Sequence, residues 1–264
     1  MFQRPVPIAC DAFDPNPTSE QSEAKSPSRL WHNSARADSL PCHCAELEGV
    51  VYLPNAFKEE RISVLHDAIR RVGLATLVSL TGEGLIASHV PLLIDPEPAP
   101  YGTLLGHLAR ANPQARGAIG DALAIFLGPD GYITPSWYAT KRATGKVVPT
   151  WNYVAIHAYG PLEFIDDPIH ARQHITRLTN RHEQGRAAPW APSDAPEDFI
   201  ASQVRRIIGF RLTINRLEGK WKMSQNRPVE DRVGAAAGLE AEGKPCLAEL
   251  IRSASPGAGA GEQR

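Results

Sequence analysis

The spacing of apolar residues predicts one helix followed by a β-hairpin at the start of the patterned part of the chain. Apolar residues recur at helical spacing over about 59–71, and Gly73 then ends the predicted helix. Two apolar runs follow at 74–80 and 85–94. The segment between them, 81–84, reads Thr-Gly-Glu-Gly, which is typical of a tight turn. We therefore expect the two runs to pair as antiparallel strands.

The rest of the pattern also favours an antiparallel sheet. Strands and helices do not alternate regularly, as they would in a parallel doubly wound sheet. An antiparallel sheet that closes into a small barrel fits this order better. The predicted fold class is mainly β with peripheral helices (α+β). The further predicted strands are 103–108, 122–127, 151–159, 162–165 and 207–217, with a turn at 218–220, and the helices are 113–119, 168–183, 197–205 and short segments after Pro228 and Lys244.

Composition separates both ends of the chain from the patterned part. Residues 1–49 are rich in Pro, Ser, Asn, Asp and Glu and show no sustained period. Such a segment cannot bury enough apolar surface to offset its ordering entropy. Residues 253–261 are Gly- and Ala-rich and also have a flexible composition. We expect residues 1–50 to be either a disordered extension or a mis-called start, followed by one folded domain with C-terminal helices over 51–251 and a flexible tail over 252–264.

Charge and hydropathy narrow the classes of function. Of the 264 residues, 42% are hydrophobic and 22% charged, which is ordinary for a globular domain. The net charge of -1 gives no general reason to expect nucleic-acid binding. No stretch approaches the roughly 18–20 apolar residues that span a bilayer, and the N-terminus lacks the apolar region of a signal peptide. We expect a cytoplasmic protein without a membrane partner.

The cysteine and histidine positions do not predict a metal site. A Cys-His-Cys segment near the N-terminus lacks the second pair of ligands that zinc motifs carry. His89, His107 and His157 fall in predicted strands, where they would either converge on a metal or form hydrogen bonds within the sheet. The second interpretation is favoured. His170 and His174, four residues apart on one predicted helix, are expected to face solvent.

The segment from Pro135 to Tyr153 carries the most distinctive chemistry. It combines Trp and Tyr with Ser, Thr, Asn and Lys. A flat, anionic, heterocyclic cofactor needs such a mixture of ring faces, positive charge and orienting hydrogen bonds. The alternative is a surface hairpin whose aromatic residues pack on the neighbouring sheet, and composition leaves both open. A second segment, Lys220–Arg227, combines an aromatic ring, amides and three cations and is suited to an anion site.

Several segments together resemble the PaiB-type family of FMN-binding negative transcriptional regulators. The resemblance covers about residues 51–251, and the segments occur in the family's order, which makes it specific. They are Tyr52-Leu53-Pro54 with Phe57, Ala87–Pro91, Leu105–Gln114, Ser136-Trp137-Tyr138 with Lys141, Gly145–Tyr153, Ile208-Gly209-Phe210 and Lys222–Arg227.

This resemblance implies a split β-barrel of the pyridoxamine-phosphate-oxidase type, which forms a homodimer with FMN at the subunit interface. It implies that Ser88 and His89 line the flavin and that His107, Arg110 and Asn112 lie near its phosphate and ribityl chain. An aromatic segment would cover the ring from the other subunit, and a late amide and cation would point at the cofactor. These residues are Ser136, Trp137, Tyr138, Lys141, Thr150, Trp151, Asn152, Gln225 and Arg227.

Two functional classes remain open on the sequence. One is a regulator that binds FMN and represses transcription, as the family's name states. The other is a flavin-dependent oxidoreductase or flavin-reductase-like enzyme, which the wider fold allows because the flavin carries the redox chemistry. No DNA-reading motif supports DNA as a partner, and no residue stands out as a catalytic acid or base.

The resemblance also bears on the start of the chain. Family members begin with a Met that directly precedes Tyr, and here Val51 precedes Tyr52. Val is the written translation of a GUG start codon, so we expect translation to begin at Val51. The alternative is a genuine disordered extension over 1–50.

Overall fold

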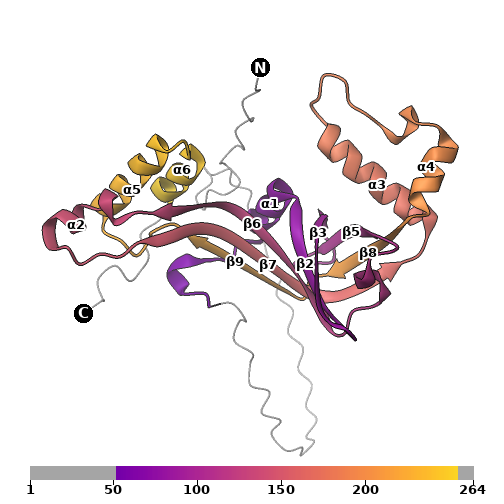
Figure 1. Cartoon of the computed structure of the whole chain (residues 1–264), viewed down its shortest axis with the longest axis horizontal. Helices are drawn as coiled ribbons and strands as arrows, with labels where there is room; N and C mark the ends of the chain where they lie inside the picture. The colour runs from indigo at the N-terminus through magenta and orange to yellow at the C-terminus, as the bar shows by residue number, and fades with distance from the viewer. Residues whose placement is uncertain (1–51, 255–264) are drawn as a thin grey trace, which may run out of the picture.

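The computed structural model describes residues 52–254, in which nine strands form one antiparallel sheet (Figure 1). Its two longest strands, β6 (Asp121–Ile133) and β7 (Thr150–Ile165), pair along most of their length. A register shift between Leu127 and Asp130 interrupts the ladder, which then continues to the end of β6. The Gly-Pro-Asp segment at this shift has the composition of a turn, yet it forms an irregularity within one long strand.

The strand order closes the sheet into a barrel. Hydrogen-bonded neighbours follow the order β3-β2-β6-β7-β8-β5-β4. The first and last of these strands, β3 and β4, are separated in the chain by Leu92 alone, so the sheet curls until its ends meet. The predicted fold class, mainly antiparallel β with peripheral helices, is confirmed. The shorter strands are β1 (Lys58–Glu59), β2 (Leu74–Thr81), β3 (Gly84–Pro91), β4 (Leu93–Asp95), β5 (Thr103–Ala109), β8 (Ile207–Thr213) and β9 (Arg216–Lys222).

Strands β8 and β9 share one edge of β7. Strand β9 pairs with the first half of β7, and β8 pairs with its last four residues. The single strand predicted over 207–217 is therefore two, and the turn predicted at 218–220 is wrong because these residues lie in β9. The glycine that suggested a turn has a packing role. A Cβ atom on Gly219 would lie 2.3 Å from the Leu65 side chain, so only glycine lets the helix that carries Leu65 approach β9 this closely.

The predicted helices are largely confirmed. The first ends at Gly73, whose φ of 68° is a left-handed value that favours glycine. The segment predicted as a helix over 113–119 is shorter and forms a 3-10 turn, and one short helix, α2, was not predicted. The helices are α1 (Ile62–Val72), α2 (Ala139–Thr144), α3 (Pro168–Glu183), α4 (Glu197–Val204), α5 (Val229–Ala241) and α6 (Pro245–Ser253), with 3-10 turns η2 (Asn55–Phe57), η3 (Pro113–Arg116), η4 (Pro135–Trp137) and η5 (Pro192–Asp194).

The main core lies between the sheet and the helices that cover it. Leu65 and Ile69 of α1 are buried in one cluster with Phe126, Ile156 and Trp221 from three strands. The buried apolar side chains of α5 and α6 belong to the same cluster. Burying such large apolar side chains stabilises the fold by roughly 1.5–3 kcal/mol each.

The molecule is elongated, with helices at both ends (Figure 1). The part of β6 and β7 beyond the register shift, with η4 and α2 between them (residues 130–153), is here called the arm. Helices α5 and α6 lie over the arm, and α3 and α4 lie at the opposite end. Within residues 52–254, no helix combines the length and apolar character that crossing a bilayer requires. The predicted extension over 1–50 and most of the predicted tail lie outside the described residues.

Candidate functional site

A small cavity of about 100 Å³ lies at the base of the arm, where the start of β7 meets the end of β9. Three of the predicted cofactor-binding residues line it, Thr150, Asn152 and Arg227. The cavity is smaller than typical pockets for cofactor-sized ligands, which enclose roughly 300–1,000 Å³. Its full lining is Val148, Pro149, Thr150, Asn152, Lys222, Ser224, Asn226 and Arg227.

Lys222 supplies a partly desolvated cation to this cavity. It lies opposite Tyr153 in the β7–β9 ladder, and its Nζ donates a hydrogen bond of 2.8 Å to Thr150 Oγ1. Burial lowers the pKa of Lys222 because the charged form loses water contacts. No acidic side chain of residues 52–254 forms an ion pair with Lys222 or Arg227. An anion bound here would therefore compensate both charges.

Asn152 and Ser224 form the polar wall of the cavity. Both are buried, and Asn152 Nδ2 donates a hydrogen bond of 2.9 Å to Ser224 Oγ. Ser224 has a φ of 60°, a left-handed value that is uncommon outside glycine. Gln225 holds the same turn, since its side chain accepts from Met223 N and donates to Trp221 O. Gln225 is therefore a support of the site, and its polar atoms are already used.

The aromatic residues of the arm divide into two kinds. Tyr138 is fully buried, with the Arg227 guanidinium 4.8 Å from its ring centroid. Trp137 packs on α5, where a Cβ atom on Gly238 would lie 2.2 Å from its ring. Trp151 is 48% exposed, and its indole nitrogen donates to Asp130 Oδ2 at 2.7 Å. Packing thus occupies Trp137 and Tyr138, whereas the ring of Trp151 is accessible to a ligand or partner.

Ser136 and Lys141 lie together at the exposed tip of the arm. Lys141 Nζ donates to Ser136 Oγ at 3.1 Å, and Ser136 N donates to the capping side chain of Thr134. Both residues lie outside the lining of the arm cavity. The structure therefore does not bring Ser136 and Lys141 together with the predicted residues that line the arm cavity.

A second group of predicted residues lies on the barrel. Asn112 Nδ2 donates to Ser88 Oγ at 3.0 Å, and Asn112 Oδ1 accepts from Gln114 N and so caps η3. His89 is exposed, with Nδ1 3.0 Å from Thr76 Oγ1. We call Ser88, His89 and Asn112 the barrel group. Its hydroxyl, imidazole and amide can donate and accept hydrogen bonds without a fixed charge.

Arg110 and His107 contact α3 or the residues just before it. Both terminal guanidinium nitrogens of Arg110 donate hydrogen bonds to Asp166, at 2.7 and 2.8 Å, and this pair lowers the pKa of Asp166. The ring of His107 lies 5.2 Å from that of His174. His174 is buried, so the prediction that it faces solvent is wrong. It lies on the face of α3 that packs against β5.

The arm cavity and the barrel group are separate within one chain. Figure 1 shows β3 and β5 well away from α2 along the molecule. In the described part of the chain, no hydrogen bond or ion pair joins Ser88, His89 or Asn112 to the lining of the arm cavity. The structure thus divides the predicted site into two partial sites.

The chemistry of both groups fits FMN. Lys222 and Arg227 suit an anionic phosphate, Trp151 offers a flat face, and the barrel group can bond the polar edge of a flavin ring. A metal is a poorer fit, because residues 52–254 contain no group of three or more His, Cys, Asp or Glu placed to hold one. Lys222 and Ser224 were not among the predicted site residues, although both belong to the Lys220–Arg227 segment.

Comparison with known proteins agrees with this chemistry. Residues 51–216 match the family "Putative FMN-binding domain". The chain is 30% identical over 206 residues to the Bacillus subtilis protease synthase and sporulation protein PAI 2, covering 76% of this chain and 96% of that protein. It is 35% identical over 242 residues to an uncharacterized protein of Emericella nidulans, with coverage of 76% and 96%.

A solved structure, that of the FAD and heme binding protein from Mycobacterium smegmatis, is similar at 18% identity. Its TM-score is 0.46, over 62% of this chain and 73% of that one, a level that says nothing by itself of function. The family match spans more than half of the chain and confirms both the resemblance and the predicted cofactor, FMN. The chain belongs to the PaiB-type family of FMN-binding domains.

Proposed function

We propose that this protein is a cytoplasmic homodimer that binds FMN between its subunits and acts as a negative transcriptional regulator. The observation that carries this proposal is the division of the site. The arm cavity encloses only about 100 Å³ and is lined by Lys222 and Arg227, which have no ion-pair partner within residues 52–254, and the barrel group offers neutral hydrogen-bonding groups elsewhere. A second subunit that places its arm beside this barrel would complete one site from two partial ones.

Exposed apolar side chains on the arm support such a contact. Trp151, Tyr132 and Val148 are exposed, the last at 66%, and Leu127 at the register shift is equally exposed. They lie on two paired strands and the loop that joins them. Apolar residues gathered in this way favour a protein interface over solvent.

The residues have separate roles in this proposal. Lys222 and Arg227 would hold the phosphate, since Arg110 is already neutralised by Asp166. Ser88, His89 and Asn112 of the other subunit would bond the ring edge. When bound, FMN supplies one- and two-electron redox chemistry. The protein's part is to bind it, orient it and exclude water.

A flavin titration tests this proposal. FMN fluorescence should be quenched at micromolar protein, with one FMN per chain, and the protein should sediment as a dimer. Absence of FMN binding at micromolar protein would remove the cofactor from the proposal. The alternative function, a flavin-dependent oxidoreductase, predicts that NAD(P)H bleaches the bound flavin in the absence of oxygen.

Direct DNA binding should be weak and salt-sensitive. The net charge is -1, and the sequence contains no recognisable reading helix, so few phosphate contacts are expected. A gel-shift series between low and physiological salt measures this. Nanomolar, sequence-specific binding at physiological salt would contradict the expectation and would show that regulation acts through direct contact with DNA.

A further inference from the structure

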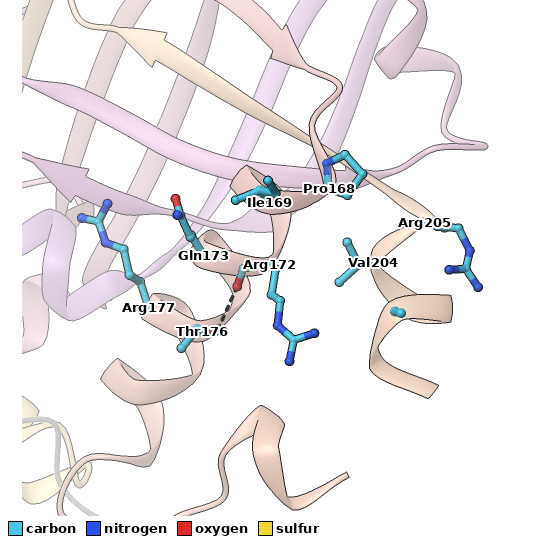
Figure 2. Close-up of a pocket in the computed structure, with 9 residues that line it drawn as sticks. Pro168, Ile169, Arg172, Gln173, Thr176, Arg177, Val204 and Arg205 are labelled. Atoms are coloured by element: carbon cyan, nitrogen blue, oxygen red, sulfur yellow. Dashed lines mark hydrogen bonds between the residues drawn. The ribbon is translucent and has the colours of Figure 1, made fainter. Parts of the chain in front are cut away.

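A groove lies between α3 and α4, at the end of the molecule opposite the arm (Figure 2). It encloses about 770 Å³, which is within the range of ligand clefts of roughly 300–1,000 Å³. Apolar side chains form much of its lining, among them Ile169 of α3 and Ala201 and Val204 of α4. Ile169 is largely exposed, so an apolar occupant would bury surface that a single chain leaves in water.

The rim of the groove is cationic. Arg172, Arg177 and Arg205 all line it, and in Figure 2 the side chain of Arg172 extends between the two helices while those of Arg177 and Arg205 extend outward on either side. Arg172 pairs with Glu197, and Arg177 lies 3.7 Å from Asp95, whereas Arg205 has no acidic partner within residues 52–254. Among residues 52–254, no acidic side chain lines the groove itself. The groove therefore suits an occupant with an apolar face and carboxylates beside it.

Helix α5 presents a surface of this kind. Val229, Val233 and Ala237 are exposed at intervals of four residues and so form an apolar stripe on one face. Val229 is 59% exposed and Val233 is 62% exposed. Glu230, beside the stripe, is exposed and has no ion-pair partner in the described part of the chain.

The orientation of α5 is fixed by its opposite face. Asp231 Oδ1 accepts from Thr140 N of α2 at 2.9 Å, and Arg232 Nη2 donates to Ile251 O of α6 at 2.7 Å. Asp231 and Arg232 are both buried. The stripe therefore cannot turn inward without breaking these bonds, and it remains available to another molecule.

We propose that α5 of one copy docks into the groove between α3 and α4 of a second copy. The apolar stripe fills the groove and Glu230 meets its arginine rim, in the manner of an amphipathic helix in a groove. One chain cannot make this contact with itself, because α5 and the groove lie at opposite ends of the molecule. If α5 of each copy docks into the groove of the other, the arm of each copy also comes towards the barrel of the other. The inference therefore rests on the homodimer of the proposed function.

Two substitutions at Val233 form a matched pair that tests this contact. Val233→Lys and Val233→Asp remove the same apolar side chain and add opposite charges. Because Val233 is exposed in the single chain, neither substitution should measurably change the melting temperature of the protein. In sedimentation equilibrium of the full chain, Val233→Lys should raise the dimer dissociation constant at least tenfold more than Val233→Asp. The order should reverse when Arg205→Glu is added to both.

Parallel FMN titrations separate the possible outcomes. If both variants dimerise like the unmodified protein and still bind FMN, the docking of α5 is overturned and the proposed function stands. If the unmodified protein is a monomer at tens of micromolar, both are overturned. If Val233→Lys raises the dimer dissociation constant more than Val233→Asp but the protein binds no FMN, the docking is supported and the proposed function fails.

Discussion

The free energy of unfolding should fall by about 3 kcal/mol as the pH is lowered from 6.5 to about 4, through His174 alone. Burial lowers the pKa of His174 from 6.5 to about 4, and the neighbouring His107, His170 and Arg177 act in the same direction. The unfolded chain binds a proton below pH 6.5, whereas the folded chain keeps this imidazole neutral until about pH 4. Acid therefore favours the unfolded state within that window, and His174 adds nothing further below it.

Urea unfolding at several pH values, compared between the unmodified protein and His174→Phe, measures this effect. The substitution keeps a ring of similar size in the buried position and removes the titration. Carboxylates contribute equally to both proteins, so the difference between the two curves reports the titration of His174 together with its coupling to His107 and His170. Equal loss of stability in both proteins between pH 6.5 and 4 would show that His174 is not held neutral.

Replacing Lys222 should have the largest effect on cofactor affinity. Lys222→Met keeps most of the length of the side chain and removes its charge, which should weaken FMN binding by about 1.5–3 kcal/mol, the range for hydrogen bonds to charged groups. This corresponds to a roughly 10–150-fold higher dissociation constant. Fluorescence titration with FMN provides the measurement.

Lys244→Met is the control for this experiment. Lys244 lies beside the arm at the start of α6 and is exposed, so its loss changes the net charge by the same amount. It lies outside the arm cavity. Equal affinities of Lys222→Met and Lys244→Met for FMN would place the phosphate elsewhere, with Arg110 as the next candidate.

Elements that carry their own signals were predictable from the sequence. Helix α3 has the predicted bounds because Asp167 caps its first turn through a bond to Ile169 N and Pro168 occupies its first position. The end of α1 at Gly73 is a local signal of the same kind. The barrel followed from the short connections between strands.

Elements that depend on distant contacts were not predictable. The turn expected at 218–220 failed because Gly219 serves the approach of Leu65, a residue more than 150 positions away. The burial of His174 depends on β5, whose position relative to α3 the sequence does not reveal.

In the candidate site, too, features with a local signal were predictable and features that depend on distant contacts were not. The aromatic segment and the late cations were predicted from their own composition, and the structure brings parts of both together at the arm cavity. However, the packing of Trp137 on α5 and the ion pair that occupies Arg110 are tertiary contacts, and they change what these residues can do. Lys222 was passed over because its role depends on its place opposite Tyr153 in the ladder.

Mixing two defective variants tests directly whether each FMN site is built from two subunits. Lys222→Met impairs the arm, and His89→Glu places a carboxylate in the barrel group against an anionic cofactor. Each alone should bind FMN weakly. In an equimolar mixture that exchanges subunits, half of the dimers are mixed and each has one intact site, so about one site in four should regain the affinity of the unmodified protein. An FMN titration of the mixture that shows no recovery, after mass spectrometry has confirmed mixed dimers, would contradict a site shared between subunits.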